Sequence, residues 1–258
     1  MDASGRGPLA GLKVLEFGQI AAGPFAGSLL ADLGADVVKV ERPDGGDDMR
    51  RWPPIVAGAS GAGYSENFAS VNRNKRSVAV DLKDAPQLAR LKRLCQQIDV
   101  IVENFRSGVL ERLGLGYAAL AQSNPRLVYC SINGYGQSGP YAGKGAFDAT
   151  VQAISGIMSV TGETGGPPAK CGVPVGDFGA GVCAGNIESS NGNARVTPTP
   201  RIKVLRGICF FVMKILDCRV ACSPSSSVSS SSYSFSPGRK PVKRIRMSLP
   251  GVYPDKRI

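Results

Sequence analysis

Asp177 is the residue whose type and neighbours point most directly to chemistry. It lies within residues 170–181, Lys-Cys-Gly-Val-Pro-Val-Gly-Asp-Phe-Gly-Ala-Gly, where small residues surround the carboxylate. A bulky acyl group can approach a carboxylate in such a setting, and carboxylates act as nucleophiles that form covalent intermediates. An Asp before an apolar, glycine-spaced stretch is also a common helix cap. The run by itself therefore leaves both a nucleophile and a cap open.

Two further segments could bind an anionic ligand. Residues 72–76, Asn-Arg-Asn-Lys-Arg, fit either an exposed charged turn or a phosphate site. Residues 134–139 have the pattern Gly-x-Gly-x-x-Gly, which in dinucleotide-binding proteins links a strand to a helix. However, residues 140–145 are a poor helix sequence, and no acidic residue ends a following strand at the expected spacing. A glycine-dependent turn at the end of a strand is the simpler interpretation.

Seven cysteines stand at positions 95, 130, 171, 183, 209, 218 and 222, and the chain has no histidine. The odd number, the lack of a Cys-x-x-Cys pair and the lack of histidine argue against a zinc site and a secreted disulfide framework. We therefore predict no metal site and a reduced intracellular compartment. Cys171 and Cys183 flank Asp177, but no histidine is present to activate a thiolate, so both are expected to be small packing residues.

The formal net charge of +11 is concentrated towards the carboxyl-terminal end. Residues 1–185 carry 18 basic and 17 acidic side chains, whereas residues 186–258 carry 13 and 3. A serine-rich tract at 223–236 and a basic cluster at 239–246 could bind nucleic acid by charge alone. Few aromatic side chains and no nucleic-acid-binding motif accompany them, so no specific nucleic-acid partner is expected.

Neither the amino terminus nor the most apolar stretch of the chain indicates a targeting signal or a membrane span. The first eight residues, Met-Asp-Ala-Ser-Gly-Arg-Gly-Pro, contain neither an apolar signal core nor an arginine-rich amphipathic presequence. The most apolar stretch, at 207–213, is far shorter than the roughly 20 residues that a membrane span needs. These features predict a soluble intracellular protein, cytoplasmic or mitochondrial, with no membrane partner.

The first forty residues predict a β-α-β unit. A short apolar run at 13–17 ends at Gly18, Pro24 suits the first turn of a helix, and Gly34 can end that helix before a buried strand at 37–40. Further strands are expected at 78–82, 100–102 and 127–132, and helices at 87–97, 109–113 and 148–158. This alternation predicts an α/β domain with a Rossmann-like, mostly parallel sheet.

The character of the chain changes after Gly185. Residues 186–193 are polar, and the serine-rich and basic segments follow them. Such a composition cannot bury enough apolar surface to offset the entropy of ordering. We therefore predict a folded domain at residues 1–185 and a largely disordered tail at residues 186–258.

Five segments occur in an order that resembles the amino-terminal half of the class III CoA-transferases, also called the CaiB/BaiF family. They are residues 11–25, 30–43, 71–77, 102–106 and 134–140. The resemblance covers roughly residues 8–185 and implies an incomplete large α/β domain of that family. It also implies that Asp177 is the nucleophile, that coenzyme A is a substrate, and that no further cofactor takes part.

The resemblance further implies a set of residues that contact coenzyme A: Gln19, Arg42, Asn72, Lys75, Asn104, Phe105, Arg112 and Lys144. In the family, a carboxylate like Asp177 attacks an acyl-CoA thioester to give a mixed anhydride. The CoA thiolate then forms an aspartyl-CoA thioester, which the acceptor acid resolves. Residues 71–75 and 130–137 look most like members that transfer CoA between succinate and hydroxymethylglutarate. Dicarboxylates such as succinate and glutarate are therefore the expected substrates.

Two alternatives remain beside this interpretation. The α-methylacyl-CoA racemases share the fold but use a histidine in place of Phe147, and this chain has no histidine to act as the base. The second alternative is a catalytically inactive, truncated isoform. Family members continue with a second domain, a glycine-rich loop over the active site and a segment that completes the first domain, and none of these is recognisable after Gly185. Full-length members form interlocked dimers, and the missing segments argue against that assembly here.

Overall fold

The structure is a computed structural model that describes part of the chain. The described residues are 7–58, 61–137 and 139–185, with short strands at 189–190, 193–194 and 219–221. The chain divides into two compact units, Met1–Ser223 and Pro224–Ile258, and every described residue belongs to the first. Apart from those three short strands, the tail predicted to be disordered lies outside the described residues.

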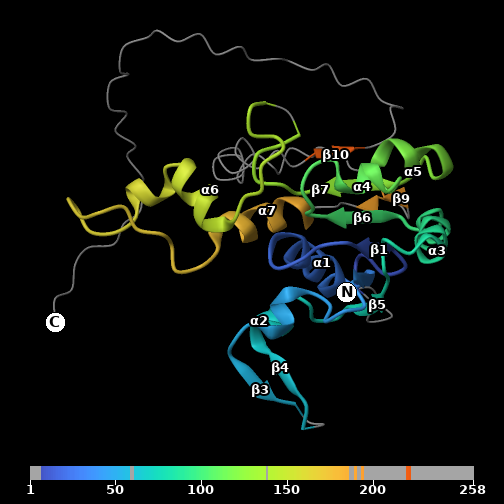
Figure 1. Ribbon diagram of the computed structural model, residues 1–258, viewed down its shortest axis with the longest axis horizontal. Helices are drawn as coiled ribbons and strands as arrows, with labels where there is room; N and C mark the ends of the chain where they lie inside the picture. The colour runs from blue at the N-terminus through green and yellow to red at the C-terminus, as the bar shows by residue number, and fades with distance from the viewer. Residues whose placement is uncertain are drawn as a thin grey trace. The chain divides into compact units, whose positions relative to one another are not determined.

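A six-stranded sheet forms the centre of the first unit, in the order β10-β7-β6-β1-β2-β5 (Figure 1). Its strands are β1 (Lys13–Glu16), β2 (Asp36–Glu41), β5 (Arg76–Ala79), β6 (Val100–Glu103), β7 (Val128–Ser131) and β10 (Arg219–Ala221). The first five are parallel, which confirms the predicted α/β architecture. β10 pairs antiparallel with β7 at the edge, within the segment for which the sequence predicts disorder. The short strands β8 (Ser189–Ser190) and β9 (Asn193–Ala194) pair only with each other.

Helices cover both faces of the sheet. They are α1 (Ala22–Asp32), α3 (Ala85–Cys95), α4 (Val109–Arg112), α5 (Tyr117–Ser123), α6 (Asp148–Ile154) and α7 (Val175–Gly185). Residues of α1 and α7 share one apolar cluster with Val14 of β1, whereas residues of α3, α4 and α5 share the other with Leu15. Successive side chains of a strand point to opposite faces of the sheet, so Val14 and Leu15 of β1 must both be apolar.

The β1-α1-β2 unit forms as the sequence predicts. Gly34 ends α1 with a φ of 99°, and its N–H donates to the carbonyl of Ala31 at 2.9 Å. The N–H of Ala35 donates to the carbonyl of Leu30 at 3.0 Å, which completes a Schellman motif. The chain then enters β2, which lies parallel to β1 with Val14 opposite Val37.

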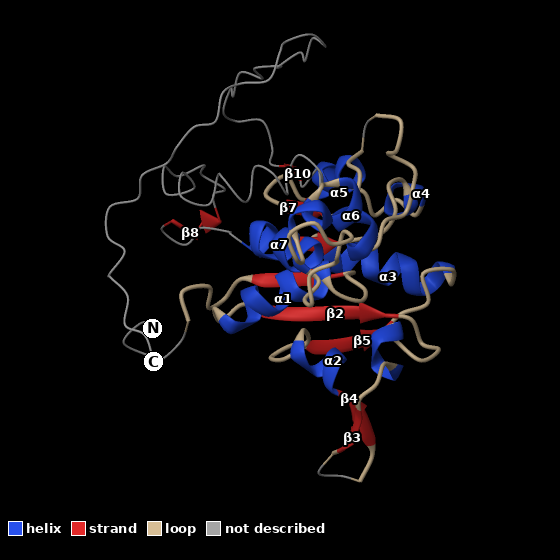
Figure 2. Ribbon diagram, turned by 90° about the vertical axis from the view of Figure 1, so that its left-hand side faces the viewer, coloured by secondary structure: helices blue, strands red, loops and turns tan. Residues whose placement is uncertain are grey.

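The structure contains a β-hairpin that the sequence did not predict. It consists of β3 (Ile55–Ala57) and β4 (Gly63–Ser65), and it lies between the 3-10 helix η1 (Asp48–Arg51) and the short helix α2 (Glu66–Ser70). Figure 2 shows the two strands extending away from the β5 edge of the sheet. Strands of three residues are too short to produce a recognisable alternation in sequence.

Several predicted boundaries are wrong by one to four residues, including the helix expected at 87–97, which is α3 at Ala85–Cys95. The strand expected at 78–82 is β5, which begins at Arg76 because it pairs with β2 from that residue onward. The helix expected at 148–158 ends at Ile154, since Gly156 adopts a φ of 80° that a helix does not allow. A separate 3-10 helix, η2 (Ile157–Val160), follows. The chain then reaches α7, the helix that carries Asp177.

Candidate active site

Asp177 lies in the first turn of α7, a helix that packs tightly against α1. A side chain at Gly181 would meet the Phe25 ring at 2.9 Å and the backbone oxygen of Ala22 at 3.0 Å. The rings of Phe178 and Phe25 lie 4.7 Å apart between their centroids. The glycines that follow Asp177 therefore allow α7 to pack closely against α1, and this packing fixes the position of the carboxylate.

Asp148, at the start of α6, holds the amino-terminal end of α7. Its Oδ1 accepts hydrogen bonds from the backbone N–H groups of Gly176 at 2.8 Å and Asp177 at 3.3 Å. Its Oδ2 accepts from Nε2 of the fully buried Gln152 at 2.5 Å, and Oε1 of Gln152 accepts from the N–H of Cys171 at 2.8 Å. This network joins α6, the loop before α7 and the first turn of α7. Asp148 rather than Asp177 provides the capping side chain.

The pKa of Asp177 is raised from 3.8 to about 6, mainly because the carboxyl group is buried and secondly because Asp148 carries the same charge nearby. A carboxyl group with this pKa is still ionised in most molecules at neutral pH. It is also more basic than an ordinary aspartate, which favours nucleophilic attack and proton exchange near physiological pH.

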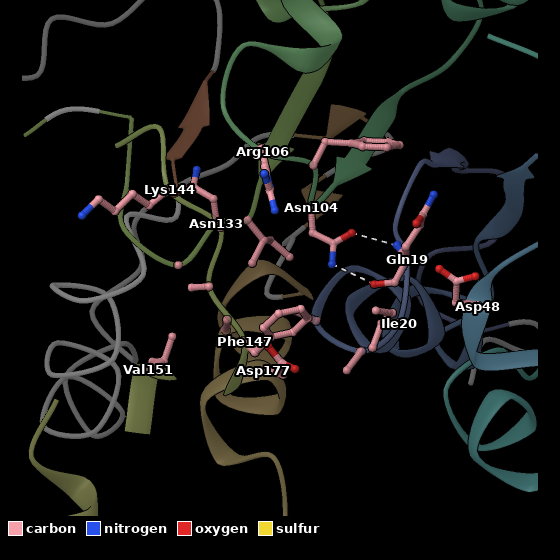
Figure 3. Close-up of a pocket in the computed structure, with 18 residues that line it drawn as sticks. Gln19, Ile20, Asp48, Asn104, Arg106, Asn133, Lys144, Phe147, Val151 and Asp177 are labelled. Carbon is pink, nitrogen blue, oxygen red and sulfur yellow. Dashed lines mark hydrogen bonds between the residues drawn. The ribbon is translucent and has the colours of Figure 1, made fainter. Parts of the chain in front are cut away.

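A cavity of about 480 Å³ opens over Asp177 (Figure 3). Its lining consists of residues 19–22, Asp48, residues 104–106, 132–134 and 144–147, Val151, Asp177 and Ala180. The first, third and fourth of these groups follow β1, β6 and β7, so the cavity lies at the carboxyl ends of parallel strands. Ligand sites of open α/β sheets occur at this edge. In Figure 3, Gln19 and Asp48 lie on one side and Lys144 on the other, with Asp177 and Phe147 between them.

The structure brings together five of the nine predicted site residues. Gln19, Asn104, Phe105, Lys144 and Asp177 line the cavity, whereas Arg42, Asn72, Lys75 and Arg112 do not. The five come from segments that are far apart in the sequence, and the fold places them around one space.

Asn104 uses its side-chain amide to hold the backbone of Gln19. Its Oδ1 accepts from the Gln19 N–H at 2.8 Å, and its Nδ2 donates to the Gln19 carbonyl at 2.9 Å (Figure 3). Both polar atoms of the amide thus have a backbone partner. Asn104 fixes one side of the cavity by joining the segments after β1 and β6.

Lys75 is buried in a network of oxygen atoms, with 2% of its side chain exposed. Its Nζ forms an ion pair with Glu16 at 2.7 Å and donates to the carbonyls of Pro24 at 2.6 Å and Val71 at 2.8 Å. A further bond goes to Oδ1 of Asn72 at 3.0 Å. Burial lowers the pKa of Lys75 to about 8. The Lys75 ammonium group therefore contacts oxygen atoms of the protein itself. The prediction from the sequence was that it contacts phosphate.

Neither Arg42 nor Arg112 lines the cavity, but Arg42 contacts a residue that does. The Arg42 guanidinium pairs with Asp48, which does line the cavity, and its Nε donates to the carbonyl of Asp44 at 3.0 Å. Arg112 is exposed on α4. Arg42 is therefore one contact away from the cavity.

Sequence reasoning missed Arg106, Asp48, Asn133 and Asp148. Arg106 is an exposed cation that lines the cavity and follows Phe105 in the segment already identified at 102–106. Its position three residues after the end of the buried strand β6 was the available signal, because such residues lie at the carboxyl edge of a parallel sheet. Asp148 gave a weaker signal as the first residue of an expected helix.

The glycine pattern at 134–139 does not lead into a helix. Turns follow it, and α6 begins only at Asp148. A side chain at Gly134 would meet Cβ of Ala146 at 2.1 Å, so this glycine permits a close approach of two cavity-lining segments. Neither Cys171 nor Cys183 lines the cavity. Cys171 is a free thiol, but Cys183 is disulfide-bonded, contrary to the expectation of a simple packing residue.

Among the described residues, no helix combines the length and apolar character needed to cross a membrane. Residues 9–187 match the family model of CoA-transferase family III. The chain is 49% identical over 177 residues to a succinate–glutarate CoA-transferase of Agrobacterium fabrum, covering 68% of this chain and 44% of the relative. It is 45% identical over 177 residues to a human succinyl-CoA:glutarate CoA-transferase, covering 69% of this chain and 40% of the relative. The chain thus spans less than half the length of these relatives.

Solved structures show the same relationship. A CaiB/BaiF family protein from Brucella suis superposes with a TM-score of 0.67 at 42% identity, over 70% of this chain and 47% of that one. A hypothetical protein from Mycobacterium tuberculosis superposes with a TM-score of 0.62 at 36% identity, over 69% and 48%. The family match covers well over half of this chain, and the five ordered segments lie within it. The chain belongs to CoA-transferase family III.

Proposed function

We propose that this chain carries the nucleophile and one face of the acyl-CoA site of an enzyme that moves coenzyme A between carboxylic acids. The observation that carries the proposal is the setting of Asp177. Its partly buried carboxylate lines a cavity, its backbone is fixed by Asp148, and its pKa of about 6 leaves it ionised yet basic at neutral pH. This combination suits a carboxylate nucleophile.

In the proposed reaction, a carboxylate oxygen of Asp177 attacks the thioester carbonyl, the C–S bond breaks, and coenzyme A leaves as the thiolate. The thiolate attacks the aspartyl carbonyl of the resulting anhydride, which releases the donor acid and leaves an aspartyl-CoA thioester. The acceptor carboxylate attacks this thioester and expels the thiolate again. The thiolate then attacks the acceptor carbonyl, forms the new acyl-CoA and restores Asp177. No proton is gained or lost over the cycle.

Arg106 and Lys144 are the proposed partners of the coenzyme A anions. Both are exposed cations in the cavity lining, and guanidinium and ammonium groups bind phosphate through charged hydrogen bonds. Nζ of Lys144 lies 4.4 Å from the centre of the Tyr141 ring. Arg42 contributes indirectly, since it neutralises Asp48 at the cavity wall.

The proposed substrates are dicarboxylic acids such as succinate and glutarate. Relatives that match this chain are named for succinate, glutarate, mesaconate and oxalate. Racemisation is disfavoured because Phe147 lines the cavity and the chain has no histidine.

Binding without turnover is the second candidate function. It is favoured by the 72% exposure of Phe147 in the cavity lining, because an active site usually excludes water from the reacting carbonyl. The interlocked homodimer stays a prediction carried over from full-length family members, and the cytoplasmic or mitochondrial location stays a prediction for this chain.

Transfer of coenzyme A from succinyl-CoA to glutarate tests the proposal. The chain as given is compared with Asp177→Ala and with the matched control Asp36→Ala, which removes an exposed aspartate paired with Arg76. Hydroxylamine should trap an aspartyl hydroxamate at position 177, detectable by peptide mass spectrometry. Undiminished turnover in Asp177→Ala would refute the nucleophile. Saturable binding of coenzyme A without transfer would support the binding function instead.

A further inference from the structure

The turn between β1 and α1 forms one wall of the cavity in a conformation that its sequence does not favour. Ile20 has a φ of 63°, in the left-handed region that β-branched residues rarely occupy. Gln19 and Ile20 both line the cavity. A non-glycine residue persists in this region only where its surroundings over-determine it. The contacts of this turn must therefore hold the backbone of Ile20 in its left-handed conformation.

Asp47 holds the strained residue directly. The N–H of Ile20 donates to both carboxylate oxygens of Asp47, at 3.2 and 3.1 Å. The Asp47 side chain is fully buried, and its Oδ1 also accepts from the N–H of Met49 at 3.0 Å. The backbone N–H of Asp47 donates to Glu41 at 2.9 Å. Asp47 is thus fixed on both sides and does not itself line the cavity.

Lys39 connects Asp47 to the same turn. Its Nζ lies 3.0 Å from Asp47 and 3.0 Å from Glu16, and it donates to the carbonyl of Gly18 at 2.6 Å. The side chain is only 2% exposed. Glu16 in turn pairs with Lys75, so two cations and two anions alternate in a buried row. A buried row of this kind is costly to desolvate, and its charges must be paired to persist.

The turn is held from the opposite side by Asn104, whose amide bonds the N–H and the carbonyl of Gln19. Three successive residues, Gly18, Gln19 and Ile20, therefore have backbone groups bound by side chains rather than by other backbone. Gly18 and Gly23 permit the tight passage into α1, since a side chain at Gly23 would meet the Cα of Gly18 at 2.8 Å.

We propose that Asp47 and Lys39 are positioning residues that hold the Gly18–Ile20 turn with Ile20 in its left-handed conformation, so that this wall of the coenzyme A site exists before the ligand binds. The inference rests on the proposed function for its ligand. It also gives Lys75 a role as the far end of the buried row. Without the row, the turn relaxes and only a fraction of molecules can bind, which weakens the apparent affinity by that fraction.

The test is a double-mutant cycle between Asp47→Asn and Ile20→Gly in the 258-residue chain, read by titration with coenzyme A. Glycine adopts a positive φ without strain, so the turn in that background no longer depends on Asp47. Asp47→Asn should weaken binding about 10-fold with Ile20 present, and less than about 3-fold with Ile20→Gly. Asp36→Asn, which neutralises an exposed ion-paired aspartate, is the matched control and should leave binding unchanged.

Hydrogen exchange followed by mass spectrometry provides a readout that needs no ligand. Asp47→Asn should speed exchange in peptides that span residues 18–22 and leave α7 and β7 protected. Equal losses of affinity in both backgrounds, or faster exchange throughout the domain, would overturn the inference and leave Asp47 a general stabilising residue. If the parent chain does not bind coenzyme A, the proposed function fails, and the exchange result alone decides the positioning role.

Discussion

Ionised Asp177 should destabilise the fold at neutral pH. Its pKa rises from 3.8 to about 6 in the folded chain, which corresponds to roughly 3 kcal/mol against the charged form. Roughly 0.5 kcal/mol of this penalty is already present at pH 4, where the carboxyl group of the unfolded chain is more than half ionised. We therefore expect Asp177→Asn to gain about 2 kcal/mol of unfolding free energy at pH 8, relative to any difference at pH 4.

The pH dependence follows from the direction of the pKa change. Below about pH 3 both the folded and the unfolded chain hold the proton, so the penalty is absent. Between about pH 4 and pH 6 the unfolded chain has lost its proton while the folded chain retains it, so folded-state stability falls as pH rises, and above about pH 7 the penalty is constant. Urea denaturation of both proteins at pH 4, 5, 6 and 8 measures this curve, with Asp36→Asn as an exposed control. A difference between Asp177→Asn and the parent that does not vary with pH would refute the burial of the carboxylate.

Three further predictions concern the neighbours of this carboxylate. Coenzyme A transfer should rise with pH through a midpoint near 6, and Asp148→Asn should move that midpoint to lower pH because it removes the second cause of the raised pKa; an unmoved midpoint would mean that burial alone sets it. Arg106→Ala should weaken coenzyme A binding about 10-fold or more while the exposed control Arg112→Ala changes little, and titration with coenzyme A and its 3′-dephospho form shows which phosphate is involved. Gly181→Ala should destabilise the chain by about 1–3 kcal/mol, because the added methyl group meets α1; thermal unfolding measures the loss, and an unchanged Tm would show that α1 and α7 can separate freely.

The sequence determined the architecture because the relevant signals are local. The β1-α1-β2 unit follows from an apolar strand, a proline near the helix start and Gly34 at its end, all within thirty residues. The strands β6 and β7 are buried on both faces, so they read as short continuous apolar runs. The hairpin β3–β4 and the break at Gly156 escaped prediction, since short strands and a single left-handed glycine leave little periodic signal.

The sequence also identified part of the candidate site. Gln19, Asn104, Phe105 and Lys144 were identified from the family resemblance, and Asp177 from its small-residue surroundings together with that resemblance; all five line one cavity. Gln19, Asn104 and Phe105 follow strands whose carboxyl ends meet at one edge of the sheet, which is the physical reason that they lie together. The same topological rule would have identified Arg106, which directly follows Phe105.

Only the tertiary structure decided what the charged residues do. Residues 72–76 read as a basic cluster suited to solvent or phosphate, yet Lys75 is buried because Gly27 leaves space for Glu16 to approach it. Asp148 and Asp177 are far apart in the sequence, and only the packing of α6 on α7 makes one the cap of the other. Local sequence sets where helices and strands form through hydrophobic periodicity. Which buried charges become partners depends on close contacts between distant segments, and no local pattern encodes these.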